Sequence, residues 1–116
     1  MGSLSEVGHA AWRGAAEILQ QRLGCGGPGE PALLACFCAA WCYVCADWRP
    51  VFETQASAHP ELRFVWVDIE DEADWCDALD IENFPTLLLM REGAVVHAGP
   101  VLARAATLEA LLARVG

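Results

Sequence analysis

The sequence predicts a single α/β domain in which helices cover both faces of a mixed β-sheet. The 116 residues are enough for one hydrophobic core but not for two. Segments with the apolar spacing of helices alternate with short apolar runs typical of strands, and this order indicates a β-α-β unit. Near the end, two such runs flank Glu92-Gly93, which is typical of a hairpin turn. We therefore expect one three-layer α/β/α domain over residues 1–116, closed by a C-terminal hairpin and helix.

The first half of the chain is expected to form two helices with a strand between them. Apolar residues recur at helical spacing over about residues 9–23. Residues 32–39 (ALLACFCA) are almost continuously apolar, as in a strand that is buried on both faces. Helical spacing returns over residues 44–55, where Pro50 should kink the helix before residues 59–60 (His-Pro) end it.

The second half is expected to add three strands and two helices. Residues 62–69 (LRFVWVDI) form a strand, and a helix follows over about residues 72–79. The hairpin strands span residues 86–91 and 94–98, and an apolar stripe predicts a last helix over about residues 103–115. The order is α-β-α-β-α-β-β-α, without an internal repeat or a linker.

Composition narrows the classes of function. The chain has 7 basic residues, all arginine, against 16 acidic residues, and its net charge of −9 argues against binding to nucleic acid. A hydrophobic fraction of 55% excludes a disordered chain, and no apolar run is long enough to cross a bilayer. The N-terminal residues lack the pattern of an export signal, so we expect a cytoplasmic protein whose clustered cysteines serve redox or metal chemistry.

Two cysteines lie where the first expected strand leads into the second expected helix, in the motif Trp41-Cys42-Tyr43-Val44-Cys45. Cys42 would lie at the helix N-terminus, where free backbone N–H groups and the helix dipole favour a thiolate. Cys45, one turn further on, would be close enough to resolve a mixed disulfide on Cys42. A Cys-x-x-Cys pair in this strand-to-helix position is typical of a redox motif.

Further landmarks accompany this motif along the chain. They are AAWCYVC at 39–45, Pro50, Asp68-Ile69 at a strand end, Phe84-Pro85-Thr86, Gly93 and Gly99. With these landmarks the sequence resembles the thioredoxin family over nearly the whole chain from the first helix onward. The resemblance implies a thioredoxin-like fold for the domain.

The same resemblance implies roles for individual residues. Cys42 would be the exposed nucleophile, and Cys45 the buried resolving thiol. Pro85 would follow a cis peptide bond and face this pair. A groove for the chain of a partner protein would be lined by Trp41, Phe84, Pro85 and Gly99.

Several positions depart from standard thioredoxins. The buried aspartate that relays a proton to the resolving thiol is replaced by Cys36, and a lysine beside it by Trp66. The usual Gly-Pro between the redox cysteines is Tyr43-Val44, and only residues 3–7 are available for an extended first strand. We therefore expect a divergent relative of the standard thioredoxins.

Two more cysteines precede the motif and leave three interpretations open. The strand period of two places Cys36 and Cys38 on one face of the sheet. With Cys42 and Cys45 they could bind zinc or an iron–sulfur centre. Alternatively they are small buried hydrophobic residues, or one of them exchanges with Cys45 as an internal relay.

The remaining candidates are weaker. Cys25 and Cys76 are isolated and are expected to be free thiols, with Cys25 exposed enough to link two chains. Residues 68–82 hold eight of the 16 acidic residues and no basic one, as in a solvated face or a docking surface for a basic partner. The three histidines lack the spacing of metal ligands.

The sequence thus predicts a thiol–disulfide oxidoreductase that reduces disulfides in partner proteins through Cys42 and Cys45. We expect no cofactor beyond a redox-active Cys42–Cys45 disulfide, and a reductase or glutathione as electron donor. We also expect a monomer, without a nucleic-acid or membrane partner. The alternatives are a non-catalytic binding module of the same fold and a metal-binding domain built on the four clustered cysteines, Cys36, Cys38, Cys42 and Cys45.

Overall fold

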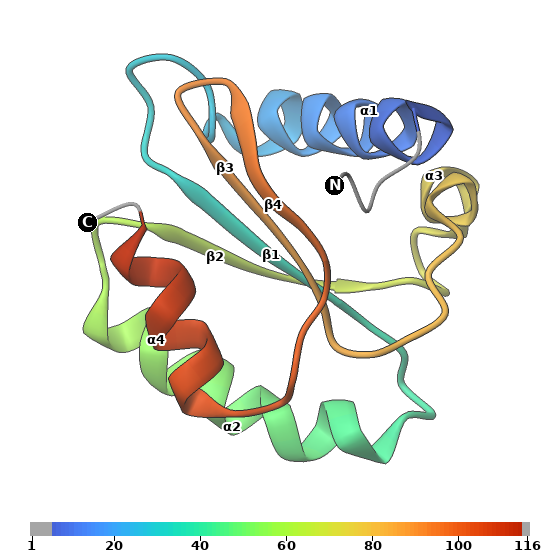
Figure 1. Ribbon diagram of the computed structural model, residues 1–116, viewed down its shortest axis with the longest axis vertical. Coiled ribbons are helices and arrows are strands. Elements are labelled where there is room, and N and C mark those ends of the chain that lie inside the picture. The colour runs from blue at the N-terminus through green and yellow to red at the C-terminus, as the bar shows by residue number, and fades with distance from the viewer. Residues whose placement is uncertain (1–5, 115–116) are drawn as a thin grey trace.

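A four-stranded sheet forms the centre of the fold, with helices on both of its faces (Figure 1). The computed structural model describes residues 6–114, and their side chains from residue 11 onward. Its elements, in chain order, are α1 (Glu6–Leu23), β1 (Leu33–Cys38), α2 (Tyr43–Ala58), β2 (Arg63–Asp68), α3 (Ala73–Cys76), the 3-10 helix η1 (Asp77–Leu79), β3 (Thr86–Arg91), β4 (Ala94–Pro100) and α4 (Ala105–Ala113).

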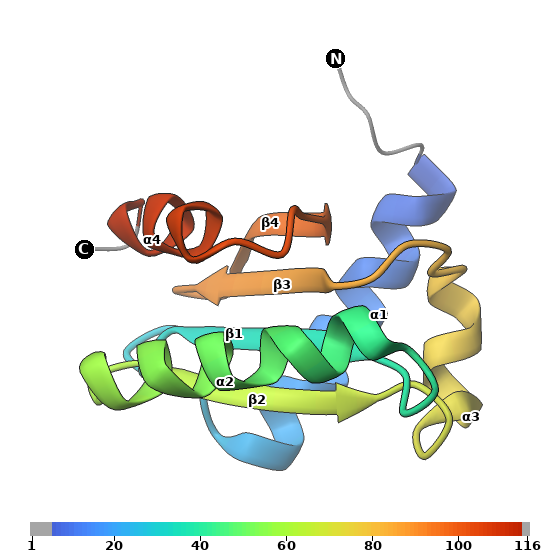
Figure 2. The same cartoon turned by 90° about the horizontal axis from the view of Figure 1, so that it is seen from below.

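The sheet is mixed, as the sequence predicts. Its strand order is β2-β1-β3-β4, which is visible edge-on in Figure 2. β1 pairs with β2 in parallel and with β3 in antiparallel orientation, and β3 and β4 form the antiparallel hairpin. β1 is therefore a central strand, and its six residues are all buried.

Alternation along β1 divides the hydrophobic core into two halves. Leu33, Ala35 and Phe37 point toward α1 and α3 and belong to the core on that face. The intervening residues, Cys36 among them, point toward α2 and α4 on the opposite face. The prediction that Cys36 and Cys38 share a face is confirmed, because both belong to this second half.

Several expected elements differ in their bounds from those observed. α1 begins earlier, at Glu6. The expected helix over 72–79 is one turn of α-helix followed by the 3-10 helix η1. β4 is longer than predicted and ends at Pro100. α4 spans Ala105–Ala113, shorter than the expected 103–115, and residue 115 lies outside the described residues.

Two further expectations concern Pro50 and the extended first strand. α2 continues as a helix through Pro50, whose carbonyl oxygen accepts a hydrogen bond from Thr54 Oγ1 at 2.8 Å. Of the residues considered for an extended first strand, 3–5 lie outside the described part of the chain. Glu6 and Val7 belong to α1 instead of a strand.

No helix in the described part of the chain, residues 6–114, is both long and apolar enough to span a bilayer.

Candidate active site

The carboxyl end of β1 and the N-terminus of α2 hold the two cysteines of the motif at different depths. Cys42 is the N-cap residue of α2, with an extended backbone (φ −91°, ψ 111°), and its N–H donates to the Ala39 carbonyl at 3.0 Å. Its side chain is partly exposed, whereas Cys45 is only 2% exposed. Attack from solvent can therefore reach Cys42 but not Cys45. This placement fits the nucleophile and resolving roles that the resemblance implies, which remain predictions.

The disulfide of the structure joins Cys45 to Cys38, not to Cys42. The two Cα atoms are 5.9 Å apart, within the usual range for a disulfide. α2 packs on the face of β1 that carries Cys38, which brings this side chain against Cys45. Cys42 is a free thiol in this state. The structure thus differs from the expected Cys42–Cys45 bond, which remains a prediction for another disulfide state of the same site.

Cys36 completes a buried group of sulfur atoms. Its Sγ atom lies 3.9 Å from that of Cys38. Burial raises the pKa of the Cys36 thiol to about 12, against smaller opposing effects of the Trp48 indole and the Arg49 charge. Trp48 Nε1 is buried and has no partner in hydrogen-bond geometry among the described residues. Cys36 is therefore a protonated thiol near neutral pH, in place of the proton-relaying aspartate that the resemblance leads one to expect there.

Cys42 and Cys45 line the same cavity, of about 370 Å³. Arg49 and Trp66 form another part of its wall, with the guanidinium carbon 4.8 Å from the centre of the indole ring. Trp66 is paired in register with Cys36, as its position in the family pattern implies. A positive charge in the wall of this cavity stabilises an anionic sulfur there.

The residues expected to form the partner groove gather at the same end of the sheet. Trp41 is 66% exposed, and its ring meets that of Phe84 edge to face with centroids 5.5 Å apart. The Phe84–Pro85 peptide bond is cis, which confirms that expectation. Val101 N–H donates to the Pro85 carbonyl at 3.0 Å, and Gly99 pairs with Leu87 on the neighbouring strand.

The register between β1 and β3 relates this loop to the cysteines. Phe37 is paired with Thr86, so continuing the antiparallel register by one residue places Pro85 opposite Cys38. Sequence reasoning missed the exposure of the two residues between the redox cysteines, Tyr43 at 80% and Val44 at 37%. The sequence could have indicated this exposure, because both residues lie in the first turn of α2, outside the face that carries its buried residues.

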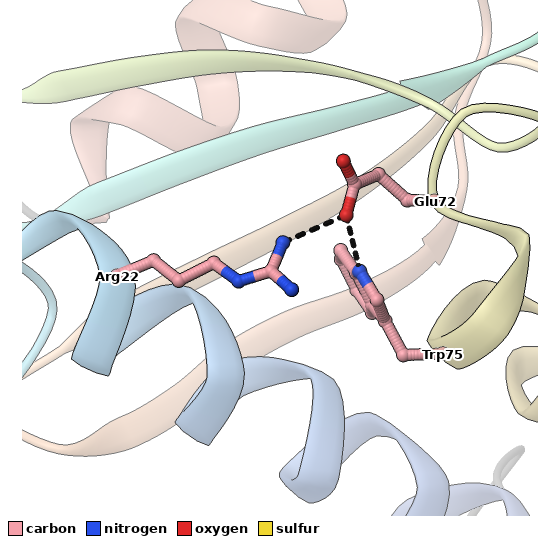
Figure 3. A network of polar contacts seen from close by, with 3 residues as sticks. All are labelled: Arg22, Glu72 and Trp75. Atoms are coloured by element: carbon pink, nitrogen blue, oxygen red, sulfur yellow. Dashed lines mark hydrogen bonds and ion pairs between the residues drawn. The ribbon is translucent and has the colours of Figure 1, made fainter.

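A second hollow, of about 410 Å³, adjoins the cysteine cavity and shares Arg49 and Trp66 with it. One wall is a polar network between α1 and the acidic segment (Figure 3). Arg22 donates to Glu72 at 2.7 Å, and Trp75 Nε1 donates to the same carboxylate oxygen at 2.6 Å. These bonds, the one from Trp75 foremost, hold the pKa of Glu72 below its usual range. The acidic segment is therefore partly neutralised by an arginine from another element.

The other two cysteines lie in the core. Cys25 is a free thiol and 2% exposed, so the expectation that it is exposed enough to link two chains is wrong. It packs against the residues under α1. Cys76 is also free and buried, and burial raises its pKa to about 12. Neither residue belongs to the group around Cys45.

The structure does not support the interpretation that the clustered cysteines bind a metal. Among the side chains described, those of residues 11–114, no three or more histidine, cysteine or acidic groups are placed so that they could hold a metal ion. Two of the four cysteines considered as ligands are bonded to each other. The donor set of this state therefore does not fit a bound metal.

Comparisons with known proteins identify the family of this chain. Residues 28–114 match the family model described as Thioredoxin, so the chain belongs to the thioredoxin family. It is 41% identical over 64 residues to the Streptomyces coelicolor protein named "Putative thioredoxin 2", covering 55% of this chain and 48% of that protein. It is 36% identical over 61 residues to "Putative thioredoxin H10" of Arabidopsis thaliana, covering 53% of this chain and 40% of that one. The chain thus matches about half the length of these curated relatives, or less.

Solved structures share the fold. A Fasciola hepatica thioredoxin superposes with a TM-score of 0.69 at 23% identity, over 84% of this chain and 88% of that one. Mitochondrial thioredoxin 3 of Saccharomyces cerevisiae, in its oxidised form, gives a TM-score of 0.68 at 22% identity, over 87% of each chain. The predicted thioredoxin-like fold is therefore confirmed.

Proposed function

We propose that this protein is a thiol–disulfide oxidoreductase that reduces disulfides in partner proteins. The observation that carries the proposal is the placement of two cysteines on one cavity at different depths. Cys42 is free and partly exposed at the N-terminus of α2, and the buried Cys45 lines the same cavity one turn further on. Membership of the thioredoxin family supports the proposal.

The reaction begins from the state in which both cysteines are reduced. The Cys42 thiolate attacks one sulfur of the partner disulfide, that bond breaks, and one partner sulfur leaves as a thiolate. Cys45, as a thiolate, then attacks Cys42 Sγ, and the second partner sulfur leaves. Two electrons pass to the partner, whose two thiolates take up the two protons given up by the cysteines. The protein is left with a Cys42–Cys45 disulfide.

The helix N-terminus and the cavity wall favour this first attack. Cys42 is the N-cap residue, so the free N–H groups of the first turn of α2 and the helix dipole stabilise negative charge on its sulfur. Arg49 adds a positive charge on the same cavity. Both features favour attack by Cys42 from the exposed position.

The partner chain would bind beside the cis-proline loop. Trp41 and Phe84 offer an exposed aromatic edge there, Pro85 immediately precedes β3, and Gly99 is the penultimate residue of β4. An extended partner segment can add strand-like hydrogen bonds to such backbone edges. A reductase or glutathione would return electrons to the disulfide, and we propose that the protein acts as a monomer in the cytoplasm.

Reduction of insulin by the full chain, with dithiothreitol as electron donor, tests the proposal. We expect wild-type protein to accelerate the precipitation of the insulin B chain, and Cys42→Ser to lower the rate to that of dithiothreitol alone. Cys76→Ser is the matched control, because this buried thiol lies on the opposite side of the sheet, and it should retain the wild-type rate. A wild-type rate in Cys42→Ser would refute the assignment. No acceleration by the wild-type protein would favour the non-catalytic binding module.

A further inference from the structure

We propose that Cys38 is a third redox-active cysteine, which exchanges with Cys42 for a bond to Cys45. The site would then have two disulfide states of equal oxidation. In the open state Cys45 is bonded to Cys42, and in the closed state it is bonded to Cys38. The inference rests on the proposed function for the open state, whereas the closed state is the one that the structure contains.

Cys45 has one potential partner on each side. On the inner side, β1 presents Cys38, whose Cα atom is 5.9 Å from that of Cys45. On the outer side, Cys42 lines the same cavity as Cys45 and precedes it by one helical turn. All three side chains belong to the same half of the core. Cys45 therefore needs no change of secondary structure to meet either partner.

The interconversion is an internal thiol–disulfide exchange. In the open state Cys38, as a thiolate, attacks Cys45 Sγ, the bond between Cys42 and Cys45 breaks, and Cys42 leaves as a thiolate. One S–S bond forms and one breaks, so no electrons enter or leave the protein. The proton lost by Cys38 is balanced by the proton that Cys42 takes up. The reverse exchange begins with attack of Cys42 on Cys45.

Because the Cys38–Cys45 disulfide is buried, an external reductant can reach it only through Cys42. Cys38 is 0% and Cys45 is 2% exposed, so a thiol in solution cannot reach either sulfur of their bond. Cys42 is partly exposed and shares the cavity with Cys45. An external reductant should therefore act on the closed bond only after Cys42 has attacked Cys45 and restored the open state.

The closed state changes what the protein does to a partner. Cys42 is then a single accessible thiol, and it can still attack a partner disulfide to form a mixed disulfide. Cys45 cannot resolve that intermediate, because its sulfur is bonded to Cys38. The closed form is therefore expected to capture partners without releasing them, whereas the reduced form completes the reaction and ends in the open state.

Disulfide mapping of the full chain tests this inference. Phe37, Trp41 and Tyr43 separate the four clustered cysteines, so chymotrypsin can place them on different peptides. The protein is refolded from denaturant with oxidised glutathione, so that bond formation does not depend on access in the folded state. It is then quenched in acid, alkylated, digested and mapped by mass spectrometry.

We expect wild-type protein to yield both the Cys38–Cys45 and the Cys42–Cys45 linkages. Cys42→Ala should yield the first alone, and Cys38→Ala the second alone. Reduced glutathione should open the bond of refolded Cys42→Ala about tenfold or more slowly than that of wild-type protein, because access governs exchange rates. Cys76→Ala should give the wild-type map and rate.

Each of two outcomes would overturn the inference. One is a wild-type map without the Cys38–Cys45 linkage, which is read on the native sequence and so does not depend on whether a variant folds. The other is reduction of the bond in Cys42→Ala at the wild-type rate. Failure of the proposed function is a different result, since it would appear as absence of insulin reduction whatever the map shows.

Discussion

Reducing the Cys38–Cys45 disulfide is expected to destabilise the protein by a calculable amount. The bond links residues separated by seven positions in the sequence. Closing a loop of that length removes conformational entropy from the unfolded chain worth about 2.4 kcal/mol at room temperature in the chain-entropy model. With a urea dependence of about 2 kcal/mol per molar, typical of small domains, the midpoint of unfolding should fall by about 1 M on reduction.

The loss of stability on reduction is measured by urea unfolding of the oxidised and the reduced form of the wild-type protein and of two variants. Because both forms of a variant carry the same substitution, the cost of that substitution cancels in the difference between them. In Cys38→Ala the remaining bond joins Cys42 to Cys45, three positions apart. Its shorter loop predicts a smaller difference, of about 1.6 kcal/mol. Cys45→Ala can form neither bond and should show no difference. A wild-type difference near zero, or an equal difference in Cys45→Ala, would refute the reasoning.

Three further predictions concern reactivity, binding and pH. Brief iodoacetamide treatment of fully reduced protein near pH 8 should label Cys42 well before Cys36 and Cys76, because the buried thiols of these two residues have pKa values of about 12. The labelled peptides are identified by mass spectrometry, and earlier labelling of either buried thiol would contradict this prediction. Trp41→Ala should raise KM for insulin and leave the rate with a small aromatic disulfide nearly unchanged, and an equal loss with both substrates would argue against a role in partner binding. Because the pKa of Glu72 is held below its ordinary value of 4.5, its contribution to the free energy of unfolding should be present above pH 4.5 and lost as the pH falls below it. Unfolding curves of wild-type and Glu72→Gln protein should therefore converge in acid, and a constant gap would contradict the assignment.

Most of the fold could be predicted from the sequence, because its signals are local. The uninterrupted apolar run before the cysteine motif indicated the buried strand β1, and Glu92-Gly93 indicated the hairpin. Element ends were less accurate. The expected third helix is divided between α3 and η1, although residues of both parts reach the core under α1.

The outline of the site was also predictable, whereas its pairing was not. The spacing of Cys42 and Cys45 and the shift from strand to helix placed one thiol at a helix N-terminus and one inside. Which cysteine bonds to Cys45 depends on the distance between α2 and β1, and spacing along the chain carries no information about that distance. The bond between Arg22 and Glu72 joins residues 50 positions apart and was invisible for the same reason.

Trapping the first intermediate tests the central claim most directly. In Cys45→Ser the resolving thiol is absent, so a mixed disulfide between the protein and a partner should accumulate. Reduced Cys45→Ser protein is mixed with insulin, quenched in acid and digested with chymotrypsin, and the cysteine that carries the partner is identified by mass spectrometry. The account predicts the partner on Cys42, which is partly exposed, with Cys36 and Cys38 unmodified because both are buried. A partner attached to another cysteine, or no mixed disulfide at all, would contradict it.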